Sequence, residues 1–393
     1  MRILHTADWH FGRSLEGRSR LPEQEAFVDE LYEIVTRENI DLILIAGDVF
    51  DTVNPPAAAE QLFYDCLARL SDGGKRQVVI IAGNHDNPDR VAASRPLADR
   101  HGITLLGLPE PTVLSIPIPA VQEEARIFAL PYPSESRLQA LLAESSEEEV
   151  LRKAYDQKLA HIFEVQSRKF SPHTVNLAMS HIYVLGSYES DSERPIQVGG
   201  AYTVSATTLP AAAQYVALGH LHKPQNVPKA PTLARYSGSP LAYSFSEAGH
   251  AKSVTVLDVK PGEPARMEEI FLSSGKPLVR WEAKEGLQQV HGWIEEGRDL
   301  GAWIDLKVHV ADSIPIEDIH KLRKAHEGLI TIQPVYPAAQ LESVTVSRSG
   351  LPIDEMFRSF YERQTGGAKP DDETVRMFLE LIGEDELDAE LES

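Results

Sequence analysis

Five short apolar segments, each followed at once by carboxylate, amide or imidazole side chains, constrain the fold of this chain most strongly. The clearest is residues 78–81, a run of four aliphatic and mostly β-branched residues that predicts a buried strand. Gly83 ends the run and allows the backbone to turn, and Asn84, His85 and Asp86 follow. In open α/β sheets the active site lies beyond the carboxyl ends of the strands, so this stretch predicts a site at a sheet edge.

The other four apolar runs end in the same kinds of side chain. These runs are residues 2–7, 41–47, 175–180 and 214–219, and the polar residues that follow them are Asp8, His10, Asp48, Asp51, His181, His220 and His222. In the pairs Asp8/His10 and His220/His222 the two residues are two positions apart, which places both side chains on one side of an extended backbone. We therefore expect all five strand ends to meet at one site.

The residue types at these strand ends favour a metal centre. Each residue alone has an ordinary explanation, because an Asp after a strand usually caps a turn and a His there is usually just hydrogen-bonded. Together the set combines oxygen donors with imidazoles and contains no thiolate, which suits divalent Mn, Fe or Zn. The set comprises Asp8, His10, Asp48, Asn84, His181, His220 and His222. Seven ligands are too many for one ion, and two ions roughly 3.5–4 Å apart with a bridging carboxylate fit better.

The composition is that of an ordinary globular protein. The chain has 393 residues, of which 42% are apolar and 25% charged, enough for a full core and two or three domains. Its formal net charge of −21 does not attract DNA, so metals or a partner must supply any such attraction. Cys66 is the single cysteine, which suits a reducing cytoplasm. We expect no signal peptide, because the first apolar run is short and Asp8 interrupts it. We expect no membrane span either, because no run approaches ~18 apolar residues.

Changes in periodicity predict three domains. Residues 1–275 contain the five apolar runs, a helical insertion at about 134–168, and a second sheet over about 223–272. The next domain, at 276–345, has a β-α-β-α-β pattern. Its expected elements are strands at 277–284, 302–311 and 329–336 and helices at 285–296 and 315–326.

A helical tail is expected over residues 350–393. Its two helices, at about 353–364 and 371–384, each carry an apolar face. The faces comprise Met356, Phe357, Phe360 and Tyr361, and then Val375, Phe378, Leu379 and Ile382. Such faces either dock onto the chain itself or bind a partner helix, and we favour the partner.

The loop after the first strand contains three arginines, Arg13, Arg18 and Arg20. Because this loop follows Asp8 and His10, the arginines are candidate phosphate contacts. A purely solvated loop is an equally good interpretation.

The motifs at the strand ends resemble a known family. The quoted stretches are Asp8-Trp-His10, Gly47-Asp-Val-Phe-Asp51, Gly83-Asn-His-Asp86, the isolated His181 and Gly219-His-Leu-His222. Their order and spacing over residues 1–222 resemble the calcineurin-like metallophosphoesterases. Over about residues 1–340 the chain also resembles the nuclease subunits of bacterial DNA-processing complexes within that family. The resemblance implies an α/β fold with a two-sheet sandwich flanked by helices, followed by a small β-α-β-α-β DNA-capping domain.

The resemblance also implies roles for the site residues. One divalent metal, expected to be Mn²⁺, would be held by Asp8, His10 and His222, and a second by Asn84, His181 and His220, with Asp48 as the bridge. His85 would act on the leaving oxygen of the scissile phosphate, and Asp86 would orient His85. Asp51 stands where archaeal relatives carry a histidine, and we interpret it as a residue that supports a ligand imidazole.

The function implied by the resemblance is that of a Mn-dependent DNA nuclease. The family suggests exonuclease activity on duplex ends, endonuclease activity on single strands and hairpins, and a homodimer that binds an ABC-type coiled-coil ATPase. Two alternatives are a phosphodiesterase or phosphatase for small molecules or phosphoproteins, and a scaffold that kept the fold without the chemistry. A scaffold is expected to lack some ligands, whereas this sequence contains all seven and His85.

Overall fold

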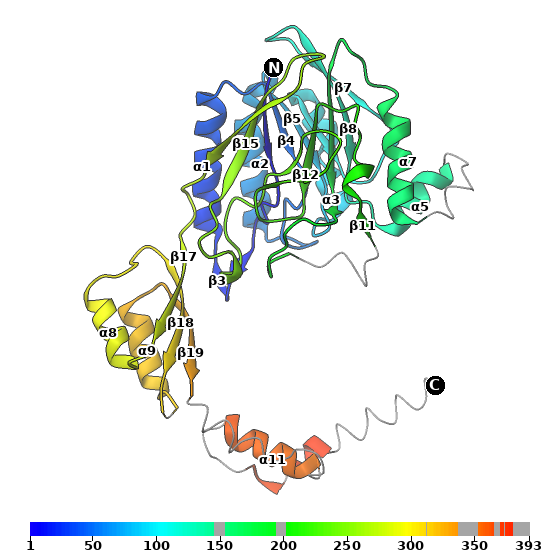
Figure 1. Cartoon of the computed structure of the whole chain (residues 1–393). Helices are drawn as coiled ribbons and strands as arrows, with labels where there is room; N and C mark the ends of the chain where they lie inside the picture. The colour runs from blue at the N-terminus through cyan, green and yellow to red at the C-terminus, as the bar shows by residue number, and fades with distance from the viewer. Residues whose placement is uncertain are drawn as a thin grey trace. The chain divides into compact units, whose positions relative to one another are not determined.

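The computed structural model describes residues 1–144, 154–193, 202–311, 313–336, 353–364, 370–372 and 374–379 (Figure 1). Contacts divide the chain into two units. The first comprises Met1–Val308 and Pro315–Gln333, and the second comprises His309–Ile314 and Pro334–Ser393. Most of the segment expected as a separate β-α-β-α-β domain therefore belongs to the same contact unit as the expected phosphoesterase region. The boundaries expected at 275 and 345 do not coincide with this division.

A first six-stranded sheet has the order β16-β15-β1-β4-β5-β6. Its strands are β1 (Arg2–Thr6), β4 (Leu42–Ile45), β5 (Gln77–Ile81), β6 (Ile103–Leu106), β15 (Ser253–Asp258) and β16 (Arg266–Phe271). The strands β1, β4, β5 and β6 are parallel, and β15 is antiparallel to both β1 and β16. The helices that follow the early strands are α1 (Leu21–Arg37), α2 (Ala57–Ser71), α3 (Pro88–Ala92) and α4 (Arg95–Ala98).

A second six-stranded sheet has the order β13-β14-β12-β9-β8-β7. Its strands are β7 (Leu114–Ile118), β8 (Glu123–Leu130), β9 (Val175–His181), β12 (Tyr215–Gly219), β13 (Gln225–Asn226) and β14 (Ala234–Tyr236). The strands β8, β9, β12 and β14 are parallel, with β7 and β13 antiparallel at the two edges. β7 is an edge strand and contains Pro117, which has no amide hydrogen to donate to a ladder. The helices of this half are α5 (Glu135–Glu144) and α7 (Tyr155–Ser167).

The two sheets pack face to face with helices on their outer sides, which confirms the expected sandwich. The buried cluster between the sheets includes Ile3 and Leu44 from the first sheet and Ile127 and Leu177 from the second. A second cluster buries the opposite face of the first sheet against α1 and α2, and a third buries the opposite face of the second sheet against α5 and α7. Figure 1 shows α1 and α7 on opposite sides of the two sheets.

One sequence expectation about the sandwich was wrong. Residues 223–272 do not form a sheet of their own, because β15 and β16 extend the first sheet next to β1, while β13 and β14 complete the second. The pairing of Arg2 with Asp258 joins residues far apart in the sequence. Local periodicity predicts such strands but not their partners, because strand pairing depends on tertiary contacts.

The β-α-β-α-β segment has the expected elements. They are β17 (Leu278–Ala283), α8 (Leu287–Glu295), β18 (Trp303–His309), α9 (Ile316–Ala325) and β19 (Leu329–Val335), with sheet order β17-β18-β19. Two short ladders pair β2 (Ser14–Leu15) with β3 (Arg18–Ser19) and β10 (Tyr183–Val184) with β11 (Thr203–Val204).

In the second unit, the helix α11 (Ile353–Gln364) is present as expected. Residues 374–379 are also helical, and the Phe357 and Phe378 rings stack with centroids 4.0 Å apart. The remainder of the second tail helix, including Ile382, lies outside the described residues. Among the helices of the described ranges, none combines the length and apolar character that a membrane span requires.

Candidate metal centre

The carboxyl ends of strands from both sheets bring the expected site residues together. In the first sheet, Asp8 and His10 follow β1, and Asp48 follows β4. The Asp8 amide donates to the Gly47 carbonyl over 3.0 Å, and the His10 amide donates to the Asp48 carbonyl over 3.0 Å. These bonds continue the β1–β4 pairing past the strands and fix the two loops against each other.

The backbone of the site is bent unusually at four candidate ligands. Asp8, His10 and Asp48 have φ values of 55°, 47° and 49°, and His220 has a φ of 106°. Non-glycine residues in such conformations cost of order 1–3 kcal/mol each and cluster at functional sites. The sharp turns direct the side chains back across the strand ends, where they converge.

Two glycines allow the loops to approach this closely. A Cβ on Gly83 would lie 2.1 Å from Asp48 Oδ1, and a Cβ on Gly219 would lie 1.9 Å from the Ala46 carbonyl oxygen. Neither position has room for any side chain.

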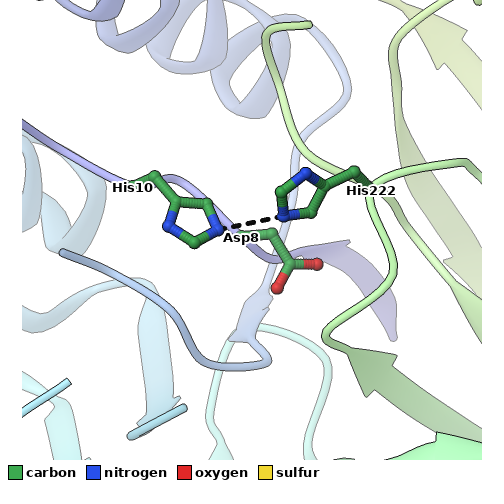
Figure 2. A group of neighbouring side chains, drawn as sticks. All are labelled: Asp8, His10 and His222. Carbon is green, nitrogen blue, oxygen red and sulfur yellow. Dashed lines mark hydrogen bonds between the residues drawn. The ribbon is translucent and has the colours of Figure 1, made fainter. Parts of the chain in front are cut away.

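The first group of ligand atoms comes from Asp8, His10 and His222, all of which are buried (Figure 2). Their ligand atoms lie within 4.8 Å of one another. The His10 and His222 rings face each other with their Nε2 atoms 3.0 Å apart. Asp8 Oδ2 is buried and has no hydrogen-bond partner among the residues that the structure describes, while Asp8 Oδ1 accepts the His220 amide over 2.8 Å.

The second group is formed by Asn84, His181 and His220. Asn84 Oδ1 lies 2.8 Å from His181 Nε2 and 3.2 Å from His220 Nδ1. His181 Nδ1 lies 2.9 Å from the Ala46 carbonyl oxygen, which can only accept, so Nδ1 donates and the ring presents Nε2 to the site. His220 Nε2 is buried without a hydrogen-bond partner.

The Asp48 carboxylate lies between the two groups. Its Oδ2 atom is 3.3 Å from His181 Nε2 in the second group and 3.7 Å from His10 Nε2 in the first. Its Oδ1 atom accepts the His85 amide over 2.8 Å. A single carboxylate oxygen thus faces imidazole nitrogens of both groups, which is the arrangement a bridging ligand requires.

The pKa shifts of the two buried carboxylates indicate a site that favours a bound cation. Burial raises the pKa of Asp8, and the neighbouring Asp48 carboxylate raises it further. Burial also disfavours the charged form of Asp48, but the His181 and His10 imidazoles hold its pKa well below the usual range. A divalent cation between the two carboxylates would offset the cost of burying them.

Burial and the neighbouring charges also shift the pKa values of the imidazoles. Burial lowers the pKa of His10 to about 3, and burial with the nearby His181 lowers the pKa of His220, so both rings are neutral and offer lone pairs. Burial opposes the charged form of His181 as well, but Asp48 raises the pKa of that ring to about 9.

The donor set therefore fits two divalent cations. Among the described residues, Asp8 Oδ2 and His220 Nε2 are buried ligand-type atoms without hydrogen-bond partners, one from each group of residues. Buried polar atoms in folded proteins are normally satisfied, so unpaired ones at a convergent site indicate a ligand. The mixture of carboxylate, amide and imidazole matches Mn, Fe or Zn chemistry.

His85 lies beside the ligands, and its ring centroid is 4.7 Å from that of His10. We expected Asp86 to orient this ring, but the structure shows a different arrangement. The Asp86 carboxylate accepts the amides of Val49, Phe50 and Gly83, and these bonds fix the two loops that carry Asp48 and His85. His85 Nδ1 instead donates to the Asp51 carbonyl oxygen over 2.7 Å. The Asp51 carboxylate lies 3.5 Å from His10 Nδ1, beside a candidate ligand ring.

The three arginines of the first loop have different environments. Arg18 is exposed in β3. Arg13 is largely buried, donates to the Ser192 carbonyl over 2.8 Å and keeps its Nη1 atom without a hydrogen-bond partner, 3.6 Å from Asp51 Oδ1.

The expectation that Arg20 contacts DNA was wrong. Its guanidinium is fully buried and binds both carboxylate oxygens of Glu23 and the Ala242 carbonyl. Spacing in the sequence does not distinguish a buried arginine such as Arg20 from an exposed one such as Arg18.

Sequence reasoning missed the side chains that surround His222. Ser192 Oγ lies 2.6 Å from His222 Nδ1, and Glu193 accepts the His222 amide over 2.8 Å. Lys252 donates to the His222 carbonyl over 2.9 Å and pairs with Glu247. These residues lie in polar segments without periodicity or motif, so no local signal marks them.

Comparisons with known proteins identify the family to which the chain is similar. Residues 1–224 match the family described as "Calcineurin-like phosphoesterase". The chain is 57% identical to SbcD of the nuclease SbcCD from Bacillus subtilis (strain 168), an alignment that covers 99% of this chain and all of that protein. It is 37% identical to SbcD of Rhodobacter capsulatus over 72% of each chain. Among solved structures, a dimetal phosphatase from Danio rerio has 12% identity and a TM-score of 0.36, over 70% of this chain and 99% of that one.

Proposed function

This chain belongs to the SbcD family of calcineurin-like phosphoesterases, and from that premise we propose that it is the nuclease subunit of an SbcCD-type complex. Its reaction is the hydrolysis of DNA phosphodiester bonds at two divalent metal ions, with Mn²⁺ as the preferred ion. The observation that carries this proposal is the Asp48 carboxylate, whose Oδ2 atom faces His10 in one ligand group and His181 in the other.

The two groups support the following ligand roles. Asp8, His10 and His222 would hold one ion, Asn84, His181 and His220 would hold the other, and Asp48 would be shared by both. When bound, the ions supply an activated water and neutralise the phosphate oxygens for in-line attack. Hydrogen bonds between the loops hold the backbone turns that carry Asp8, His10 and Asp48, and these turns would keep the side chains in place for the ions.

His85 acts on the leaving group. The Asp51 carbonyl accepts its Nδ1–H, so Nε2 is the ring atom that faces the substrate. In its protonated form the ring donates a proton to the departing sugar oxygen, a contribution of about 10²–10⁴-fold. Asp86 acts indirectly, because its carboxylate holds the amides of Val49, Phe50 and Gly83 around the His85 loop.

Substrate attraction is local. The net charge of −21 disfavours DNA over most of the surface, so the metal pair and a few arginines must bind the scissile region. Arg13 is one such arginine: it lies near His10, and its Nη1 atom is 3.6 Å from Asp51 Oδ1 without a hydrogen-bond partner in the described part of the chain. Arg18, exposed in β3, is the second phosphate contact.

The family supports a proposal for the biological setting. The chain forms a homodimer within a heterotetramer, with the coiled-coil ABC-type ATPase SbcC as partner, in the cytoplasm. The small β-α-β-α-β domain caps the DNA, and the complex degrades duplex ends from 3′ to 5′ and cuts single strands and hairpins during DNA repair, recombination and replication.

A cleavage assay tests the proposal. The purified chain is incubated with single-stranded, duplex and hairpin DNA and with bis(p-nitrophenyl) phosphate, in Mn²⁺, Mg²⁺ or a chelator. We expect Mn-dependent cleavage of single-stranded and hairpin DNA and of the small diester, and none with the chelator. Hydrolysis of the small diester without any DNA cleavage, even after SbcC is added, would favour a small-molecule phosphodiesterase. No metal-dependent hydrolysis of any substrate would favour a scaffold.

A further inference from the structure

The segment Tyr188–Glu193 lies against only one of the two candidate metal positions. Its contacts reach His222 of the first ligand group through Ser192 and Glu193. Among the described contacts, the segment has none with Asn84, His181 or His220 side chains. From this asymmetry, and on the premise of the two-metal function proposed above, we propose that Ser192 is a positioning residue that sets the affinity of the metal position formed by Asp8, His10 and His222.

A directed chain of hydrogen bonds runs through this segment. The Ser190 hydroxyl donates to Glu193 Oε2 over 2.6 Å, which uses its single proton. The Ser190 and Ser192 hydroxyl oxygens are 2.8 Å apart, so Ser192 must donate in this pair. Ser192 then has no proton left for His222, and it accepts from His222 Nδ1 over the 2.6 Å contact.

This direction fixes the tautomer of the ligand ring. With its proton on Nδ1, the neutral His222 ring keeps the lone pair of Nε2, the atom that lies 3.0 Å from His10 Nε2 in the first ligand group (Figure 2). A metal-ligating histidine depends on such a partner at its other nitrogen for both tautomer and ring orientation. Ser192 supplies that partner here.

Within the described residues, no other group lies within hydrogen-bond distance of His222 Nδ1. Glu247 Oε1 is 3.8 Å from that atom, beyond hydrogen-bond distance. That carboxylate already accepts the Tyr243 and Ser244 amides and pairs with Lys252. In the other metal group, by contrast, His181 Nδ1 bonds a main-chain carbonyl, that of Ala46, which no side-chain substitution removes.

Hydrogen bonds to other parts of the chain fix the segment near both ends, so the fold itself keeps Ser192 beside His222. Gln225 accepts the Tyr188 amide over 2.8 Å and donates to the Tyr188 carbonyl over 2.9 Å. Near the other end, Arg13 donates to the Ser192 carbonyl over 2.8 Å. The Ser192 hydroxyl, fixed in this way, restricts the orientation of the His222 ring before any ion binds.

Metal titration of Ser192→Ala tests the inference. Free Mn²⁺ is followed by electron paramagnetic resonance during titration of the full-length chain. We expect two ions per wild-type chain, and in Ser192→Ala one ion bound as in wild type and one bound about 10- to 100-fold more weakly. Ser192→Thr, which keeps the hydroxyl, should restore the second affinity. Ser237→Ala is the matched control, because Ser237 is a fully buried serine whose hydroxyl has no hydrogen-bond partner, and it should bind both ions as wild type does.

A second measurement reports on the ring itself. In ¹⁵N-histidine spectra without added metal, Ser192→Ala should shift one ring, His222, away from the Nδ1–H tautomer, and Ser192→Thr should not. Unchanged tautomer and unchanged affinity for both ions in Ser192→Ala would overturn the inference, as would equal weakening of both ions. Fewer than two ions bound by the wild-type chain would instead overturn the two-metal function on which the inference rests.

Discussion

At the residue scale, burial and partners decide what a charged side chain does, and Arg18 and Arg20 show this within three positions. Arg18 is exposed, whereas Arg20 is fully buried and binds both oxygens of Glu23. Glu23 also accepts the Lys276 amide and the Trp303 indole N–H. Arg20 therefore stabilises the junction between α1 and the segment that leads into β17.

Replacement of the two arginines by alanine should separate these roles. Arg20→Ala leaves Glu23 buried without its guanidinium, so we expect a loss of about 3–5 kcal/mol in the free energy of unfolding. Arg18→Ala should change it by no more than about 0.5 kcal/mol. Urea unfolding of both variants measures this, and equal stability of the two would contradict the structural role of Arg20.

Some residues of the site could be predicted from the sequence, and others could not. The seven candidate ligands could be named because each follows an apolar strand, and strand ends converge in this class of fold. Ser192 and the environment of Arg20 could not, since their roles depend on contacts such as those with His222 and Glu23. The bonds of Asp86 to three backbone amides have no sequence signal either.

At the scale of elements, strands were predictable and their partners were not. The β1, β4 and β5 strands follow from runs of buried aliphatic residues, and the amphipathic α1 follows from its helical spacing. Placement of β15 beside β1 depends on a contact between residues some 250 positions apart, as in the Arg2–Asp258 pair, which no local pattern encodes. The same limit applies to β13 and β14 in the second sheet.

The turn after β5 should not tolerate a side chain. A Cβ at Gly83 would overlap Asp48 Oδ1 at 2.1 Å and the Asp48 amide nitrogen at 2.3 Å, so the bridge residue must move. We expect Gly83→Ala to lose most metal binding and most hydrolysis of bis(p-nitrophenyl) phosphate. Gly73→Ala is the control, because a Cβ there meets nothing within 4 Å. Full metal content in Gly83→Ala would show that the loops adjust more freely than their close approach indicates.

The tail helices carry a prediction about partner binding. Phe357 stacks on Phe378, yet Met356 and Phe360 remain 38% and 53% exposed. We attribute this exposed apolar surface to contact with the coiled coil of SbcC. Deletion of residues 350–393 should abolish co-purification with SbcC while metal-dependent cleavage of single-stranded DNA persists. Recovery of SbcC at full yield with the truncated chain would refute this assignment.

At the scale of the whole molecule, the acidic charge predicts weak DNA binding by the isolated chain. Each phosphate neutralised by Lys or Arg contributes about −0.9 to the slope of log affinity against log salt, so Arg13 and Arg18 allow a slope of only about −2. Addition of SbcC should tighten duplex binding and steepen the slope. A salt titration of duplex binding with and without SbcC measures both. A steep slope for the lone chain would reveal a basic surface beyond these arginines.

The central claim is that binding of two metals and transfer of a proton are carried by different residues of one site. Asp48 faces both ligand groups through Oδ2, whereas among the described contacts His85 binds Asp48 through its backbone amide and donates its Nδ1–H to the Asp51 carbonyl. Removal of the His85 imidazole should therefore spare the ions, and removal of the Asp48 carboxylate should not.

The most direct test is metal analysis of His85→Ala and Asp48→Ala beside their rates of DNA cleavage. We predict that His85→Ala keeps two Mn ions per chain and loses cleavage by about 10²–10⁴-fold, as expected for the loss of a general acid. Asp48→Ala should lose both metal and activity while remaining folded by circular dichroism. A folded His85→Ala chain without its ions, or an Asp48→Ala chain that retains two ions and cleaves DNA, would contradict the assignment of the site.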